Sequence, residues 1–87
     1  MKEIMVESLS SPRCLNCEAF EKFWHSVEAQ YPNVTYQKRS ILDNDGAEMA
    51  QKFGILASPG IVINGELFSV GGVDTEKFIN KIKELST

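Results

Sequence analysis

The sequence predicts an α/β fold, in which helices on both faces cover a mixed four-stranded sheet. Three observations predict it: four short strand-like segments, three amphipathic helical segments, and their order, which is strand, helix, strand, helix, strand, strand, helix. Because helices separate the first three strands, we expect the first two to run parallel through a right-handed crossover. A hairpin then completes the sheet.

The first strand and first helix occupy the N-terminal third of the chain. Ile4 to Leu9 places Ile4 and Val6 on one face of a strand, and the turn-forming Ser10-Ser11-Pro12 bounds it. From 14 to 31 apolar residues recur at threes and fours, which predicts an amphipathic helix that Pro32 ends. The apolar positions of this helix are Cys17, Phe20, Phe23, Trp24, Val27 and Tyr31.

The second strand and second helix follow directly. Residues 34–40 alternate with the period of a strand that has at least one wet face, and an edge strand fits best. Asp43 or Asp45 can cap a short helix, and Gly54 suits the left-handed position at its end. The apolar positions of this helix are Ala47, Met49, Ala50 and Phe53.

The strongest local signal is a hairpin near the C-terminus. Asn64-Gly65 lies between the apolar runs 61–63 and 67–70 and supplies the positive φ pair that a tight antiparallel turn needs. After two glycines, Asp74 or Thr75 can cap a final helix. The apolar face of that helix comprises Phe78, Ile79, Ile82 and Leu85.

Length and composition limit the class of protein. Eighty-seven residues with 43% hydrophobic and 24% charged side chains indicate one soluble globular domain, residues 1–87. A net charge of −3 provides no basic surface for nucleic acid or an anionic membrane. No apolar run approaches the roughly 18 residues of a membrane helix, and Glu3 and Glu7 interrupt the N-terminus where a secretory leader would be apolar. We therefore expect a cytoplasmic protein.

The two cysteines, Cys14-Leu15-Asn16-Cys17, stand where the first loop becomes the first helix. Free N–H groups and the positive end of the helix dipole stabilise a thiolate there. Cys14 lies at or before the first turn, beside Arg13, and Cys17 lies about one turn deeper on the apolar stripe. We expect Cys14 to attack a disulfide and Cys17 to resolve the mixed disulfide that results.

Other uses of the cysteine pair remain as alternatives. A structural staple across so short a loop would remove only about 2 kcal/mol of unfolded-state freedom, so it is the weaker interpretation. Paired thiolates also form half of many zinc sites. His25, the only histidine, lies eight residues beyond Cys17, roughly 80° round the helix and about 12 Å further along it, and is expected to be solvated. A soft metal or an iron–sulfur cluster would therefore need ligands from a second subunit or glutathione.

The cysteine pair, a proline opening the third strand, the Asn-Gly hairpin and a glycine pair before the last helix together resemble the thioredoxin/glutaredoxin superfamily. The similarity covers essentially the whole chain and looks closest to small thioredoxin-like redox proteins of archaea and bacteria. Ser58 to Gly65 is the most family-specific stretch. The resemblance implies a thioredoxin-like fold with strand order 2-1-3-4. It also implies a cis Pro59 that packs beside the sulfurs, and a Ser58 whose backbone pairs with an extended substrate.

The chain departs from thioredoxin proper around the cysteines. Arg13 replaces the family's tryptophan, Leu15-Asn16 replaces Gly-Pro, and Ser8 stands where thioredoxins carry a buried aspartate. That last departure leaves the route for the resolving thiol's proton open. Gly71-Gly72-Val73-Asp74 matches a glutaredoxin motif that receives glutathione. A turn followed by an Asp N-cap already explains Gly71, Gly72 and Asp74 and is the preferred interpretation.

These patterns lead to a ranked set of hypotheses. The first is a monomeric thiol–disulfide oxidoreductase that reduces protein disulfides, needs no bound cofactor or metal, and is recycled by a flavin-dependent disulfide reductase. The second makes glutathione the reductant. The third is a carrier of a soft metal or an iron–sulfur cluster through the same cysteine pair.

Overall fold

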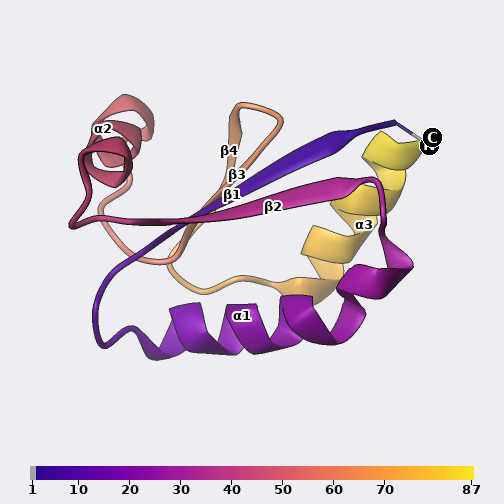
Figure 1. Cartoon of the computed structure of the whole chain (residues 1–87), viewed down its shortest axis with the longest axis horizontal. Helices are drawn as coiled ribbons and strands as arrows, with labels where there is room; N and C mark the ends of the chain where they lie inside the picture. Colours follow the sequence, from indigo (N-terminus) through magenta and orange to yellow (C-terminus); the bar gives the residue numbers. More distant parts are fainter. Residues whose placement is uncertain (1) are drawn as a thin grey trace.

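The computed structural model describes residues 2–87. Met1 lies outside the described residues. It is the first residue of the predicted domain and of the N-terminal segment that was predicted not to be a secretory leader. The predicted order of elements is confirmed (Figure 1): β1 (Ile4–Ser10), α1 (Leu15–Val27), a single 3-10 turn η1 (Glu28–Gln30), β2 (Val34–Ser40), α2 (Asn44–Phe53), β3 (Gly60–Ile63), β4 (Glu66–Val70) and α3 (Thr75–Ser86). None of the helices within residues 2–87 has the length and apolar character that crossing a membrane requires.

The sheet has the predicted order, β2-β1-β3-β4. β1 runs parallel to β2, while β3 runs antiparallel to both β1 and β4. β2 is therefore an edge strand, as its alternating pattern predicted. In the hairpin, Asn64 has φ 51° and Gly65 has φ 79°, which is the positive pair expected of a tight turn.

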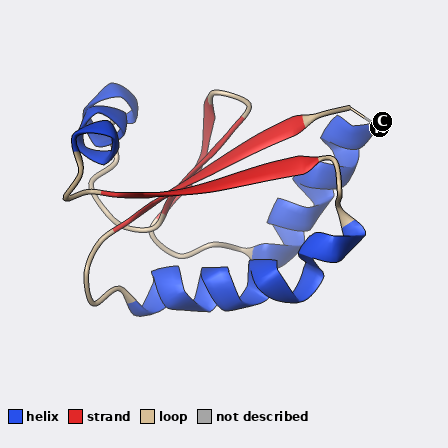
Figure 2. Ribbon diagram, in the orientation of Figure 1, coloured by secondary structure: helices blue, strands red, loops and turns tan. Residues whose placement is uncertain are grey.

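Helices cover both faces of this sheet (Figure 2). α1 and α3 share one face, where Phe20, Trp24, Phe78 and Ile82 pack with alternate residues of β1 and β3. α2 lies on the other face, where Met49 joins a smaller apolar cluster with the opposite residues of those strands. The alternation of side chains along each strand divides the core in this way.

The first helix is shorter than predicted. It ends at Val27, and the chain continues as a 3-10 turn instead of an α-helix reaching Tyr31. Tyr31 has φ −130° and precedes Pro32, whose ring excludes the helical conformation from the residue before it. The periodicity was still informative, because Tyr31 packs on the core and stacks on Trp24 with 6.3 Å between ring centroids.

The helix caps follow the sequence with one exception. Gly54 ends α2 in the left-handed conformation with φ 65°, and the carboxylate of Asp74 accepts a backbone N–H in the first turn of α3 at 3.1 Å. Asp43 occupies the N-cap position of α2, but its side chain makes no capping hydrogen bond. The predicted aspartate therefore occupies the N-cap position, but the capping hydrogen bond that the prediction assumed is not formed.

Candidate active site

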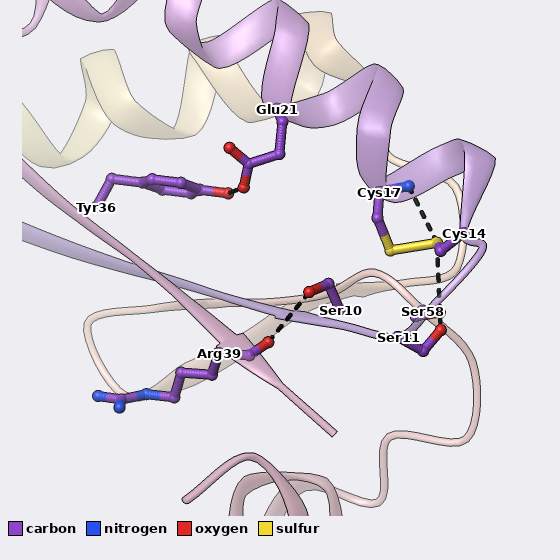
Figure 3. Close-up of a disulfide and its surroundings, with 8 residues drawn as sticks. All are labelled: Ser10, Ser11, Cys14, Cys17, Glu21, Tyr36, Arg39 and Ser58. Atoms are coloured by element: carbon purple, nitrogen blue, oxygen red, sulfur yellow. Dashed lines mark hydrogen bonds between the residues drawn. A yellow bond between two sulfur atoms is a disulfide. The ribbon is translucent and has the colours of Figure 1, made fainter. Parts of the chain in front are cut away.

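The two cysteines form a disulfide at the N-terminus of α1 (Figure 3). Cys14 is the N-cap residue, with extended backbone, and its Sγ accepts the backbone N–H of Cys17 at 3.1 Å. The sulfur therefore takes the place that a serine or aspartate oxygen holds in an ordinary cap. After reduction, the same N–H and the positive end of the helix would stabilise negative charge on this sulfur.

The two cysteine residues differ in exposure. Cys17 is 5% exposed and begins the buried face of α1, whereas Cys14 is only half-buried. Residues three apart on a helix lie on the same face, so the buried stripe continues from Cys17 directly into the core. Cys14 is therefore the more accessible of the two residues.

Strand register brings the second predicted segment to the disulfide. Leu9, near the end of β1, pairs with Gly60 at the start of β3, so the loop after one strand meets the segment before the other. The hydroxyl of Ser58 donates to Cys14 Sγ at 3.4 Å and shares a hydrogen bond of 2.6 Å with the hydroxyl of Ser11. Ser58 and Cys14 are 44 residues apart in sequence.

The bond between Ser58 and Pro59 is cis, as the family resemblance implied. Pro59 is fully buried, and its carbonyl accepts the N–H of Gly71 at 3.0 Å. Within residues 2–87, neither the backbone N–H nor the C=O of Ser58 is hydrogen bonded to another backbone group. The Ser58 backbone thus remains available beside Cys14.

The predicted glutathione residues lie near this site and have local explanations. Gly71 has φ 84°, a conformation that favours glycine, and its N–H is already bonded to Pro59. Asp74 caps α3. Gly72 borders a cavity of about 180 Å³ that Asn16, between the two cysteines, also lines. The turn and the cap account for Gly71 and Asp74, and a glutathione contact stays a prediction.

A solvent-open cavity of about 490 Å³ lies beside the disulfide. Both cysteines and two serine hydroxyls line it, together with titratable side chains from α1, β2 and the loop before α1. These titratable residues are Arg13, Glu18, Glu21, Lys22, His25 and Lys38.

At this cavity the Glu21 carboxylate accepts the hydroxyl of Tyr36 at 2.5 Å. Burial, with a smaller contribution from this hydrogen bond, raises the pKa of Tyr36 above its ordinary value, so the phenol stays protonated.

The described residues hold no ready metal site. Among residues 2–87, no three His, Cys, Asp or Glu side chains lie close enough together to hold a metal ion. His25 is exposed on α1, as expected, where its ring contacts Glu21 and Glu28. A metal or cluster on the cysteines would need ligands from outside the chain, as that alternative assumed.

Three residues of the site, Ser11, Glu21 and Tyr36, were not singled out from the sequence. Ser11 was interpreted only as part of a turn. Arg13 was noted as the neighbour of Cys14, but nothing in its residue type signals its positive φ of 58°. Glu21 could have been found from the sequence, because it lies four residues after Cys17 and this spacing places both residues on one helix face. Its partner Tyr36 could not be found this way, because the pairing depends on how α1 packs on the sheet.

Comparison with known proteins decides the family. The family model of the thioredoxin domain matches residues 2–84. The chain belongs to the thioredoxin domain family. It is 29% identical over 85 residues to a thioredoxin of Methanocaldococcus jannaschii, an alignment that covers 97% of this chain and 98% of that protein.

Solved thioredoxins share the fold. Thioredoxin f from spinach chloroplast superposes with a TM-score of 0.79 at 18% identity, over 99% of this chain and 79% of that one. Fasciola hepatica thioredoxin gives 0.75 at 20% identity, over 94% and 80%. A complex of ferredoxin:thioredoxin reductase with thioredoxin f2 gives 0.77 at 17% identity, over 99% and 80%.

Family membership and the cysteine pair together establish the chemical class. The chain is a dithiol–disulfide oxidoreductase of the thioredoxin domain family, and the resemblance seen in the sequence is confirmed. Members of this kind exchange electrons through a redox-active disulfide, which needs no separate cofactor. The Cys14–Cys17 disulfide at the head of α1 has the position and the chemistry of such a centre.

Proposed function

We propose that this protein reduces disulfide bonds in other proteins, with Cys14 as the attacking thiol and Cys17 as the resolving thiol. The main observation behind this proposal is that the two cysteines of the disulfide differ in exposure and in hydrogen bonding. Cys14 is the more exposed cysteine, and its Sγ accepts hydrogen bonds from a helix N–H and a serine hydroxyl, whereas Cys17 is buried. Donors aimed at a sulfur favour its thiolate, the reactive form in disulfide exchange.

The reaction then follows in two exchanges. In the reduced protein, the Cys14 thiolate attacks one sulfur of the substrate disulfide, and the other substrate sulfur leaves with the electron pair of the broken bond. Cys17, as thiolate, next attacks Cys14 Sγ, which breaks the mixed disulfide and releases the second substrate thiolate. Two electrons pass to the substrate, and the protein ends with the Cys14–Cys17 disulfide present in the structure.

Ser58 and Pro59 would hold the substrate during this exchange. The free backbone N–H and C=O of Ser58 lie next to Cys14 and can pair with an extended peptide on either side of the substrate cysteine. Pro59 is buried, and its carbonyl accepts the N–H of Gly71. These contacts fix Pro59 and thereby the position of the adjacent Ser58. An extended segment of an unfolded or loop region is the substrate shape that fits.

A protein reductase would return the electrons. The solved complex of a thioredoxin f2 with ferredoxin:thioredoxin reductase supports a protein partner for chains of this fold. For this chain we propose a flavin-dependent disulfide reductase as the donor and a monomer as the working form, located in the cytoplasm.

Insulin reduction tests the proposal. With dithiothreitol or a reductase as electron source, the wild-type protein should accelerate precipitation of the reduced insulin B chain, and Cys14→Ser should abolish the acceleration. Cys17→Ser is the matched control, because it keeps the attacking thiol and should accumulate a stable mixed disulfide, visible by mass spectrometry. Reduction by Cys14→Ser at the wild-type rate would refute the assignment.

The alternatives predict different results with the same protein. Turnover with glutathione as sole donor, lost in Asp74→Ala, would favour the glutaredoxin-like hypothesis over a protein reductase. An absorbing species with bound metal after anaerobic purification would favour the carrier hypothesis. Turnover only with the flavoprotein reductase, by a colourless and metal-free protein, is the result that we expect.

A further inference from the structure

Among residues 2–87, Glu21 is the partly buried carboxylate that lines the cavity beside the disulfide. Cys17 and Glu21 are four residues apart on α1, a separation that puts their Cβ atoms about 6 Å apart on one helix face. Both side chains line the cavity beside the disulfide, and Figure 3 shows both directed from α1 toward the strands. Glu21 is only 20% exposed.

Other groups around the cavity do not suit the same task. Glu18 also lines it, but it follows Cys17 directly, which turns it about 100° away round the helix, and it is exposed. The Arg13, Lys22 and Lys38 side chains carry hydrogen-bond donors and no acceptor, so they cannot take up the proton of a thiol. His25 lies a further turn along α1, beyond Glu21 as seen from Cys17.

Hydrogen bonds hold Glu21 in place and connect it to solvent. One carboxylate oxygen accepts the Tyr36 hydroxyl from β2 at 2.5 Å, and the other lies 3.1 Å from Nε2 of His25. His25 Nδ1 lies 2.5 Å from Glu28 on the exposed side of the helix. The hydrogen bond to Glu28, with the charges of Glu28 and Glu21, raises the pKa of His25. A chain of hydrogen-bonded groups therefore runs from Glu21, at the cavity that Cys17 also lines, to the exposed side of α1.

We propose that Glu21 accepts the proton of the Cys17 thiol when this residue resolves the mixed disulfide, and that His25 relays protons between Glu21 and solvent. The proposal rests on the proposed function of the cysteine pair. A thiol in apolar surroundings loses its proton less readily than one in water, so the buried attacking group needs a base.

The step balances as a transfer within the complex. The proton passes from Cys17 Sγ to the Glu21 carboxylate through water in the solvent-open cavity that both residues line. The new S–S bond then forms between Cys17 and Cys14, the Cys14–substrate bond breaks, and the substrate sulfur leaves with the electron pair. The departing thiolate takes up a proton either from Glu21 or from solvent. In the second case Glu21 passes its own proton to solvent through His25, so both routes restore the carboxylate.

A coloured aromatic disulfide, dithiobis-nitrobenzoate, separates the two exchanges. Mixed in equal amount with the reduced protein in a stopped-flow instrument, it releases one coloured thiolate when Cys14 attacks and a second when Cys17 resolves. General acid–base groups contribute about a hundredfold or more when well placed, and we expect Glu21→Gln to slow the second phase by about tenfold or more at pH 7. The first phase should be unchanged.

The pH profile distinguishes proton transfer from a structural role. The deficit of Glu21→Gln should shrink as the pH approaches the ordinary thiol pKa of about 8.5, because hydroxide then removes the proton. Glutamine keeps an oxygen that can accept the Tyr36 hydroxyl, so the fold is retained. Glu18→Gln makes the same charge change in the same cavity and should leave both phases at the wild-type rate.

Each outcome decides a separate point. A second phase of Glu21→Gln that matches the wild type at every pH overturns the inference. So does a deficit that is constant with pH or that Glu18→Gln reproduces. Absence of the first phase in the wild-type protein contradicts the proposed function itself and not the assignment of Glu21.

Discussion

Replacing Gly46 with alanine should destabilise the protein, although helix propensity alone predicts the opposite. Gly46 lies in the first turn of α2, where alanine in place of glycine ordinarily stabilises by about 0.5–1 kcal/mol. A Cβ on Gly46 would, however, lie 1.8 Å from the carbonyl oxygen of Ser40 and 3.1 Å from Leu9 Cδ1. The oxygen belongs to the backbone at the end of β2, so it cannot rotate away, and α2 must move off the sheet.

The expected magnitude follows from these two opposing effects. Overpacking costs typically 1–3 kcal/mol, and a backbone contact this close places Gly46→Ala at about 3 kcal/mol. After subtraction of the propensity gain of about 1 kcal/mol, the free energy of unfolding should fall by about 2 kcal/mol. For a domain of this size, that corresponds to a decrease in Tm of roughly 8–16 °C.

Urea unfolding of the oxidised protein measures this change. The fluorescence of Trp24, the only tryptophan and 2% exposed, reports loss of the core. Ala47→Gly is the matched control, because the neighbouring residue is exposed and should lose only its helix propensity, about 1 kcal/mol. If Gly46→Ala proves as stable as the wild type or more stable, the packing of α2 against the end of β2 is not as described.

Three further predictions concern stability. Phe78→Ala removes a fully buried ring that four other aromatic rings meet edge-on, and should cost about 3–5 kcal/mol by urea unfolding; a loss below 1 kcal/mol would contradict its central place. Asp74→Ala removes the side-chain cap of α3 and should cost about 1 kcal/mol, whereas Asp74→Ser, which keeps a capping oxygen, should lose little; equal losses would argue against the cap. Burial and the hydrogen bond to Glu21 raise the pKa of Tyr36 above its ordinary 10.0, so the folded protein holds that proton more tightly than the unfolded chain. The free energy of unfolding should therefore fall as the pH rises above 10, with no such contribution in Tyr36→Phe, and equal slopes for the two proteins up to about pH 11 would refute it.

The order of elements and the ends of most of them were predictable because their causes are local. The Asn64-Gly65 turn, the left-handed Gly54 and the Asp74 cap each depend on a few adjacent residues, and the structure confirms all three. The position of Cys14 at the helix N-terminus has the same local origin. The first helix shows where local patterns mislead. The apolar periodicity predicted a helix as far as Tyr31, but the α-helical hydrogen bonding ends earlier, and Pro32 disfavours the helical conformation at Tyr31.

The sequence alone therefore determined the fold class, the strand order that its family resemblance implied, and the pair of cysteines that carries the chemistry. Only the tertiary structure decided what surrounds those cysteines. Ser58 reaches Cys14 across 44 residues, and Tyr36 reaches Glu21 across 15, through the register of β1 with β3 and the packing of α1 on the sheet. Turns and caps form between residues no more than about four positions apart, so the local sequence determines them. A proton acceptor or a substrate contact forms only where separate strands and helices meet.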